Sequence, residues 1–410
     1  MDAILERCAG LDIHQDNVVA CFLFGPLDKK PSKEIQSFGT TTDELLRLLD
    51  WLQDRECVHV AMESSGVFWK PVWNILEGTC ELTLANPERI KNIPGKKTDY
   101  NDAEWIARLH RHGLIQPSFV PPEDIRDLRD LTRYRRKLVQ NVTQEKNRIH
   151  KILQDANLKL TSFITDIFGV SGRALLESIV NGEVLDEHQI RNMVKTRLKR
   201  KVPELIQALN GRLRVHHRRM LKRHLDHIAF LEQEIKELEG EIDQLTAPYR
   251  PELELLDTIP GISLDAAASI LAEVGPDMSH FPSDAHLTSW AGVCPANHES
   301  NGKKKRKKNY RGNKGLKSLL VQCGWSAIKV KNSRIPAVYY RLVKRMGKQK
   351  AIMAVAHLLL RIIYIVLRDK VPYQELGADY LGSREISVDY WIRKIQQMGY
   401  EVDLREAAPA

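Results

Sequence analysis

The sequence contains few cysteines, and no two of them are close together. Its 410 residues include six: Cys8, Cys21, Cys57, Cys80, Cys294 and Cys323. Structural zinc sites use closely spaced ligand pairs, and a disulfide framework needs a high density of cysteines. The spacing therefore argues against both kinds of site and predicts reduced, mostly buried thiols in an intracellular protein.

Two targeting features are also missing. The N-terminal segment MDAILERCAGLDIH has no basic stretch followed by an apolar one, so no signal peptide is predicted. The most apolar segment, 351–367, is interrupted by His357 and Arg361, which favours a buried helix over a membrane span. No internal repeat is found. We therefore expect a protein that does not act in a membrane.

Positive charge is in excess, with a formal net charge of +9 at pH 7, 43% hydrophobic and 28% charged residues. These values fit a soluble globular protein of two or more domains with a polyanionic partner. Many basic proteins bind no nucleic acid, however. What identifies a partner is therefore the location of the charge along the chain.

The first 120 residues alternate between strand and helix patterns. Strands are predicted as a pair within 9–24 and near 34–38, 57–63 and 82–86, and helices at 41–52, 68–76 and 99–112. The order of three strands, helix, strand, helix, strand, helix is that of a ribonuclease-H-like (RuvC-like) α/β domain. Pro121 and Pro122 mark its end, so this domain is expected to span 1–120.

Four acidic residues occupy positions that such a domain brings together over its sheet. They are Asp12 in the first strand, Glu63 at the end of the fourth, and Asp99 and Asp102, three apart on one helix face. Clustered carboxylates repel one another unless cations bind, and hard oxygen ligands suit Mg²⁺, two of which can serve phosphoryl transfer. Each acid alone is more often a turn or cap residue. The nearby Asp16 and Glu104 are expected to be solvated.

The middle of the chain predicts helices only, up to about residue 245. Apolar spacing indicates one long helix over 123–152 and a second from Leu205 to Leu245. The end of the second has the alternating spacing of a coiled-coil seam, at Leu231, Ile235, Leu238, Ile242 and Leu245. We expect a helical linker and coiled coil at 121–250, a mainly α-helical C-terminal domain at 251–372 and a peripheral segment at 373–410.

A dense basic tract lies at 303–317, where nine of fifteen residues are Lys or Arg and none is acidic. The nine are Lys303, Lys304, Lys305, Arg306, Lys307, Lys308, Arg311, Lys314 and Lys317. Such density predicts salt-dependent phosphate binding, and Gly302, Gly312 and Gly315 would allow the backbone to approach a phosphate closely. The alternatives are a solvated face or a localisation tag. The position between apolar segments of a folded domain weighs against both.

Two further stretches carry nucleic-acid signals. Residues 256–275 resemble a helix-hairpin-helix, whose turn at Gly261 would present backbone N–H groups to a phosphate; a plain helical hairpin fits equally well. Ile190 to Arg223 holds twelve Lys or Arg residues and one acid, which predicts a second nucleic-acid surface. His216 and His217 are expected to contact nucleic acid there rather than bind a metal.

Ser300 lies directly before the basic tract. From the residues alone it is an ordinary loop serine, although a hydroxyl beside concentrated cations can attack a phosphodiester if its proton is removed.

The chain resembles the DEDD transposases of insertion sequences, the one-hundred-and-ten family, which are also known as bridge-RNA-guided recombinases. The matching blocks, in order, are GLDIH, AMESSGVFWKPVW, NPERIKNIPGKKTDYNDAEWIARL, the PGI segment and WAGVCPANHESNGKKKRKKNYRGNKGLKSLLVQ. They extend over nearly the whole chain, although the segment around 155–205 matches no block. The resemblance therefore implies a DNA transposase or recombinase.

The resemblance also implies roles for individual residues. Asp12, Glu63, Asp99 and Asp102 match the acidic tetrad, and Ser300 matches the serine that becomes joined to DNA as a phosphoserine. It further implies donor and target DNA, a noncoding guide RNA that selects them by base pairing, dimers that assemble into tetramers, and a prokaryotic cytoplasm. The coiled-coil seam would suit such a dimer.

Two other functions are compatible with the residues. A metal-dependent Holliday-junction nuclease would activate water at the acidic site and would not need Ser300. A non-catalytic DNA- or RNA-binding scaffold would bind independently of Mg²⁺ and of the carboxylates.

Overall fold

The computed structural model describes residues 2–90, 102–294, 299–300, 303–304, 312–378, 392 and 395–403. The chain divides into two compact units, Met1–Val120 and Pro121–Ala410. The first is a mixed α/β unit. The described part of the second is helical apart from one two-residue hairpin.

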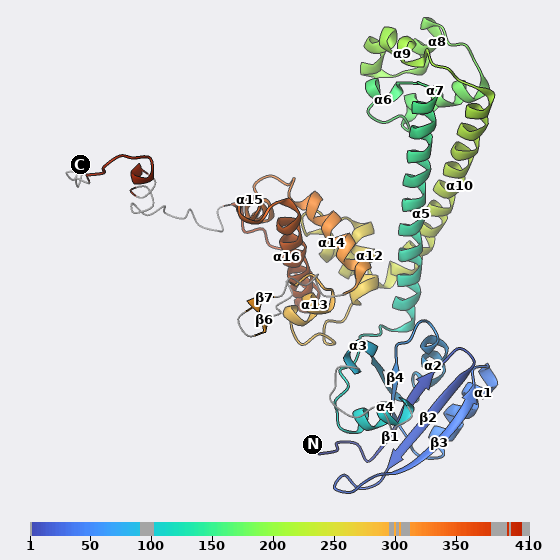
Figure 1. The fold of residues 1–410 in the computed structure, drawn as a ribbon, viewed down its shortest axis with the longest axis vertical. Helices are drawn as coiled ribbons and strands as arrows, with labels where there is room; N and C mark the ends of the chain where they lie inside the picture. Colours follow the sequence, from blue (N-terminus) through green and yellow to red (C-terminus); the bar gives the residue numbers. More distant parts are fainter. Residues whose placement is uncertain are drawn as a thin grey trace. The chain divides into compact units, whose positions relative to one another are not determined.

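The first unit is built on a five-stranded sheet of order β3-β2-β1-β4-β5 (Figure 1). The strands are β1 (Arg7–Ile13), β2 (Asn17–Phe24), β3 (Ser32–Gly39), β4 (His59–Glu63) and β5 (Glu81–Ala85). The helices are α1 (Thr42–Gln53), α2 (Trp69–Leu76), α3 (Pro87–Ile90) and α4 (Asp102–Arg111). The first three strands are antiparallel, and β1, β4 and β5 are parallel. The predicted order of strands and helices is confirmed, with the short α3 added.

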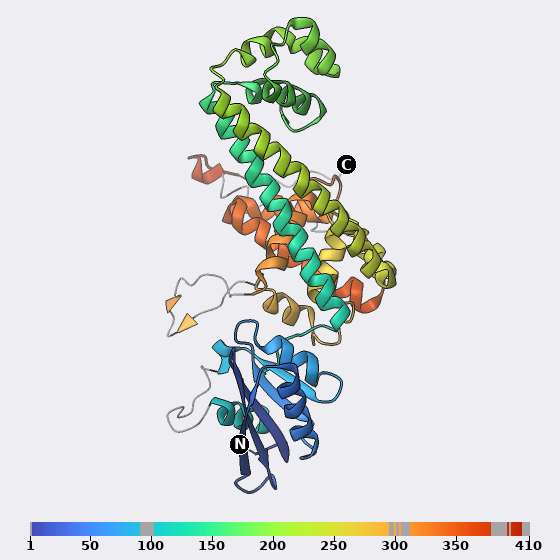
Figure 2. The same ribbon diagram turned by 90° about the vertical axis from the view of Figure 1, so that its right-hand side faces the viewer.

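Alternate side chains of β1 face opposite sides of the sheet, and each side is covered by different helices. Leu11 and its odd-numbered neighbours join a core with α1 and α2, whereas Cys8 packs with Ala103 and Ala107 of α4 on the other face. Figures 1 and 2 show α4 on one side of the sheet and α1 on the other. At Gly10 the helix lies so close that a Cβ atom would be 2.3 Å from the backbone nitrogen of Ala107.

The second unit begins with a long antiparallel helix pair, α5 (Glu123–Asp155) and α10 (Val215–Thr246). Cross-helix bonds fix the direction, because Arg135 of α5 pairs with Glu239 and the later Glu145 pairs with the earlier His224. The prediction that the second helix starts at Leu205 was wrong. The chain leaves the helix after Leu209 and turns back at Arg212, whose backbone N–H donates to the Ala156 carbonyl oxygen at 2.8 Å.

The predicted coiled-coil seam is occupied within one chain. Leu231 and Leu238 are buried in the same core cluster as Leu138 and Val142 of α5. The seam therefore stabilises the α5–α10 pair, and its burial removes the reason for expecting it to join two subunits.

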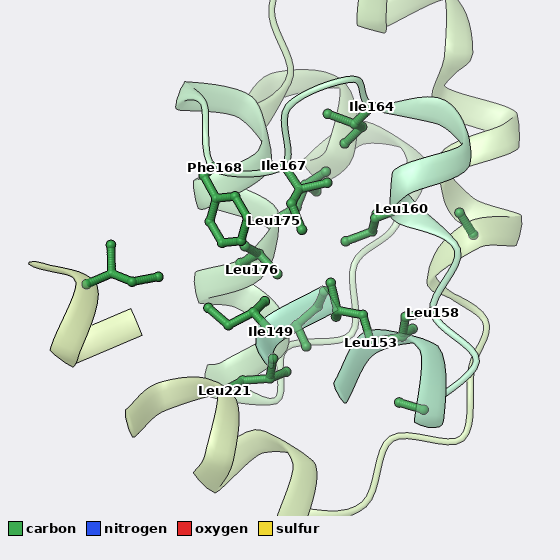
Figure 3. Packing of buried hydrophobic residues seen from close by; sticks show 14 of the residues in the cluster. Ile149, Leu153, Leu158, Leu160, Ile164, Ile167, Phe168, Leu175, Leu176 and Leu221 are labelled. Atoms are coloured by element: carbon green, nitrogen blue, oxygen red, sulfur yellow. The ribbon is translucent and has the colours of Figure 1, made fainter. Parts of the chain in front are cut away.

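A small helical tip closes the far end of this pair (Figures 1 and 2). It consists of α6 (Leu160–Phe163), α7 (Val170–Asn181), α8 (Glu187–Met193), η1 (Thr196–Lys201) and α9 (Val202–Leu209). Figure 3 shows Leu160, Ile167 and Leu175 of the tip packed toward Ile149 of α5 and Leu221 of α10. The tip and the ends of both long helices therefore share one core.

The remaining named helices complete the second unit and include α16 (Lys348–Asp369). The others are η2 (Ala247–Tyr249), α11 (Arg250–Asp257), α12 (Leu264–Val274), α13 (Asp284–Trp290), α14 (Lys314–Ala327) and α15 (Arg334–Met346). Of these, α11, α13, α14 and α15 pack against α16 (Figure 1). By length and composition α16 is apolar enough to cross a membrane. However, its residues from Ala351 to Leu367 include eleven that are buried against the protein, so the predicted buried helix is confirmed.

Candidate catalytic and nucleic-acid-binding sites

Two of the predicted carboxylates lie at the same end of the sheet. Leu11 of β1 pairs with Met62 of the parallel β4, and Asp12 and Glu63 are the next residue on each strand. Side chains alternate along a strand, so Asp12 faces the same side as Gly10, and Glu63 the same side as Ala61. Both of those residues pack toward α4.

The direction of α4 brings its first residue to that end. Arg111 in its last turn donates to the Glu6 carbonyl oxygen, which precedes β1, and Ala103 in its first turn lies against Gly10. The helix is therefore antiparallel to β1, and Asp102 starts it near the end of β1 that carries Asp12. Asp99 lies outside the described residues.

Carboxylate oxygens are the ligands that Mg²⁺ prefers, so the chemistry of Asp12, Glu63 and Asp102 is compatible with a hard divalent cation. Among residues 2–90 and 102–120, no three acidic, His or Cys side chains are close enough together to hold a metal ion. Asp12 is 21% exposed and lies 3.3 Å from Nε2 of His14, and Ser65 donates to Glu63 at 3.2 Å.

Glu104 was expected to be solvated, and that expectation was wrong. It is only 2% exposed and accepts hydrogen bonds from Lys33 and Arg108. Burial alone would raise the pKa of Glu104, but these two cationic donors outweigh it and hold the pKa below its ordinary value. Glu104 therefore anchors α4 to the sheet as a charged residue, whereas Asp16 is exposed as predicted.

Ser300 lies in the second unit, on a pair of antiparallel strands of two residues each. It ends β6 (Glu299–Ser300) and pairs with Lys303 of the antiparallel β7 (Lys303–Lys304) (Figure 1). The backbone thus places the serine opposite the first lysine of the basic tract. Gly302, Lys305, Arg306, Lys307, Lys308 and Arg311 lie outside the described residues.

Within the basic tract, Asn313 contacts a buried carboxylate, Glu273, that the sequence analysis did not single out. Glu273 of α12 is 3% exposed and accepts two bonds of 2.8 Å from Arg133 of α5. Asn313 donates to it at 2.6 Å and, as N-cap of α14, accepts from the Leu316 N–H. Burial would raise the pKa of Glu273, but Arg133 and Asn313 hold it below its ordinary value. Glu273 thus connects α5, α12 and the start of α14.

The two described glycines on either side of Asn313, Gly312 and Gly315, are closely packed, and their contact with a phosphate stays a prediction. A Cβ atom on Gly312 would be 2.3 Å from the Gly292 nitrogen, and one on Gly315 would be 2.8 Å from the Arg136 guanidinium. Lys317 also turns inward, donating to the Gly292 carbonyl oxygen at 3.2 Å. Of the two described lysines of α14 in the predicted tract, Lys314 is the exposed one.

Gly261 lies in the turn between α11 and α12, against the backbone of α14. Its φ is +85°, and a Cβ atom there would be 2.5 Å from the Ala327 nitrogen and 2.6 Å from the Cys323 carbonyl oxygen. The space beside the Gly261 Cα atom, where a side chain would otherwise be, is therefore filled by the backbone of α14. Close helix packing accounts for the glycine.

Substituting Gly261 with Ala is expected to lower the free energy of unfolding by about 2–4 kcal/mol, from backbone strain and overpacking together. Gly240→Ala is the control, because Gly240 lies within α10 with open space around it. It should raise stability by up to about 1 kcal/mol. Urea unfolding of both variants measures the difference, and an unchanged midpoint for Gly261→Ala would contradict the packing role.

The basic segment Ile190–Arg223 lies on the tip, and most of its cations are exposed. The exposed ones include Arg197, Lys199, Arg200, Lys201, Arg212, Arg219, Lys222 and Arg223. His216 is exposed, but His217 is 3% exposed and bonds to Asp155 at 2.8 Å. The prediction that His217 contacts nucleic acid was therefore wrong, because this side chain helps to close the helix hairpin.

Comparison with known proteins gives the family. One family model, described as a transposase, matches residues 9–158, and another, described as the transposase IS116/IS110/IS902 family, matches residues 253–340. The chain belongs to the IS116/IS110/IS902 family of transposases. The transposase is 26% identical over 382 residues to the pilin gene-inverting protein of Moraxella lacunata, covering 89% of this chain and 97% of that protein.

Other relatives extend this result. The pilin gene-inverting protein of Moraxella bovis is 25% identical over 386 residues, covering 89% of the transposase and 97% of the relative. A putative transposase, y4qE, of Sinorhizobium fredii is 24% identical over 279 residues, covering 66% of the transposase and 55% of the relative. The protein is thus a transposase whose substrate is DNA, as the sequence blocks predicted.

Proposed function

We propose that this transposase excises and inserts a mobile DNA element by cleaving and rejoining strands through a phosphoserine link at Ser300, with Mg²⁺ at an acidic site. The observation that carries the acidic part is the shared sheet end of Asp12, Glu63 and the start of α4 at Asp102. The strand order and the helices on both faces support a ribonuclease-H-like (RuvC-like) fold for this unit.

In this proposal the acidic site comprises Asp12, Glu63, Asp99 and Asp102. Mg²⁺ bound there would polarise the scissile phosphate and neutralise developing charge. The carboxylates themselves hold the site on rigid elements, since two are on paired strands and one begins a helix that is packed against β1. Such positioning is what phosphoryl transfer requires of a protein.

The serine step conserves the energy of the phosphodiester. Ser300 Oγ forms a bond to phosphorus as its proton leaves, the bond from phosphorus to the 3′ oxygen breaks, and that oxygen leaves as a hydroxyl after taking up a proton. A 3′-hydroxyl of another strand then attacks the phosphoserine and releases Ser300, so no energy-rich cofactor is consumed. The pilin gene-inverting relatives support cleavage followed by rejoining, because inversion of a DNA segment requires both ends to be cut and rejoined.

The nucleic-acid partners follow from the same scheme. The basic tract from Lys303 and the exposed cations of the tip are proposed to hold donor and target DNA and a noncoding guide RNA, with the protein acting as a dimer that assembles into a tetramer. Because the α5–α10 seam is buried within one chain, other surfaces must join the subunits. The bacterial relatives support a prokaryotic cytoplasm.

A covalent trap tests this function. The protein is incubated with Mg²⁺, the noncoding RNA of its element and labelled junction DNA, then denatured, and DNA-linked peptides are mapped by mass spectrometry. We expect a phosphoester on Ser300, which should be absent in Ser300→Ala and retained in Ser289→Ala, an exposed serine of α13. Cleaved DNA with no protein attached would favour the hydrolytic nuclease, and Mg²⁺-independent binding without cleavage would favour the scaffold.

A further inference from the structure

The C-terminal unit contains a second concentration of positive charge beyond the tract at 303–317. From Ser300 to Arg368 the chain contains nineteen Lys or Arg residues and no acidic residue. Ten of them come after Lys317, in the turn that follows α14 and in α15 and α16. These helices therefore add cations and no acidic side chain of their own to the surface, although Asp284 of α13 pairs with Arg361 of α16.

Aromatic side chains lie on this surface. Trp325 of α14 is 40% exposed and Tyr340 of α15 is 57% exposed. The buried ring of Tyr339 contacts both of them. Its centroid is 6.0 Å from that of the Trp325 ring and 5.3 Å from that of the Tyr340 ring. Tyr339 thus holds two large exposed rings in place, so each can bind a flat ligand with little loss of side-chain freedom.

The cations around these rings are free to bind an anion. Lys329 and Lys331 lie in the turn that follows α14, and Arg341 and Lys344 are next to Tyr340 on α15, one and four residues further along. All four are exposed. None of them forms an ion pair with an acidic residue in the described ranges, so their charge is not neutralised by the part of the fold that is described.

We propose that the face formed by Trp325, Tyr340, Lys329, Lys331, Arg341 and Lys344 binds a single-stranded nucleic acid, with bases stacked on the two rings and phosphates on the cations. Exposed rings among unpaired cations are the arrangement by which proteins hold single strands, since every base has a face to stack and every nucleotide a phosphate. A duplex hides its base faces and would use only the cations. None of these six residues is Ser300 or one of the four carboxylates of the acidic site.

The inference is tested by binding to oligo(dT) and to an abasic oligomer of equal length, both fluorescein-labelled, with the full-length protein. Wild type should prefer oligo(dT). Trp325→Ala and Tyr340→Ala should each weaken oligo(dT) binding roughly tenfold, the effect of one lost stacking partner, and leave abasic binding unchanged. Tyr340→Phe keeps the ring and should bind like wild type. Phe230→Ala is the control, because Phe230 is 59% exposed on α10, directly before the acid-rich second half of that helix.

Substituting the cations should affect binding differently from substituting the aromatic rings. Arg341→Gln and Lys344→Gln should weaken both oligomers and lower the slope of log affinity against log salt by about 0.7 each. Equal binding of both oligomers by wild type, or unchanged oligo(dT) affinity in both alanine variants, would overturn the proposal. A change in oligomeric state without a change in oligo(dT) affinity would also overturn it, since the face would then be a protein interface. Recombination is not measured, so failure of the Ser300 scheme would leave this result unaffected.

Discussion

Asp12→Asn is expected to reduce recombination by roughly 10³-fold or more, the scale on which loss of an essential charged group acts in phosphoryl transfer and similar reactions. Asparagine keeps the size of the side chain and its position at the end of β1. What it removes is the negative charge beside Glu63, which the proposed Mg²⁺ site needs. Glu63→Gln should have an effect of similar size for the same reason.

The structure offers a control for this substitution. Asp16 is an exposed aspartate in the turn between β1 and β2, four residues from Asp12. Asp16→Asn makes the same chemical change close by and should leave recombination within about twofold of wild type, as expected of surface substitutions away from a site. Full activity in Asp12→Asn, with Mg²⁺ present and the fold intact by circular dichroism, would remove Asp12 from the catalytic site.

DNA binding separates the metal role from a simple loss of folding. Asp12→Asn removes a negative charge near the path of a polyanion, so DNA affinity measured without Mg²⁺ should stay the same or rise. A variant that had lost the fold would instead lose affinity. Filter binding and recombination assays on the same preparation therefore distinguish the two explanations.

The sequence allowed the first unit to be predicted well, because its signals are local. Alternation in β1 and β4 and helical spacing in α1 and α4 each lie within a dozen residues, and they led to the element order that the structure has. The positions of Asp12 and Glu63 at strand ends follow from the same local patterns. To infer that both side chains lie on one face of the sheet, it was enough to assume that β1 and β4 pair in parallel, and the structure has this pairing.

Features that depend on distant residues were missed or misjudged. The heptad spacing of Leu231 and Leu238 was visible, but not whether its partner would be another chain or α5 of the same chain. The glycines after Arg311 suggested phosphate contact, but their close packing against residues 291–292 and Arg136 could not be read from the sequence. Glu273 resembled any helical glutamate. One hint was available, since Arg129, Arg133 and Arg136 recur at helical spacing on one face of α5.

Replacing Glu273 with Leu is expected to destabilise the protein by about 3–5 kcal/mol, because it removes a buried carboxylate that faces the largely buried Arg129 and the half-exposed Arg133. Glu273 lies 3.7 Å from Arg129, which is 15% exposed, and accepts both bonds from Arg133. Burial lowers the pKa of Arg129 to about 10, but that group still remains charged at neutral pH. The exposed pair Arg250–Glu254 is the control, and Glu254→Leu should cost less than about 0.5 kcal/mol.

The contribution of Glu273 to the free energy of unfolding should depend on pH, and its pKa gives the direction of the change. The pKa of Glu273 is lower in the folded protein than in the unfolded chain, so its ionised form stabilises the fold. That contribution is complete above the ordinary glutamate pKa of about 4.3 and is lost as the pH falls through the lower, folded value. The difference in unfolding free energy between wild type and Glu273→Gln should therefore be largest at neutral pH and shrink in acid.

The same substitution has a consequence for the proposed serine step. Asn313 bonds to Glu273 at 2.6 Å and caps α14 at the point where the chain returns from the Ser300 tract. Glu273→Gln keeps the shape but loses the charge-assisted bonds, so the start of α14 should become less ordered and phosphoserine formation slower, even at temperatures where the protein remains folded. Asn313→Asp keeps the cap oxygen but places a second carboxylate against Glu273, and it should show the same defect. Wild-type rates of phosphoserine formation in both variants would limit Glu273 to a role in stability.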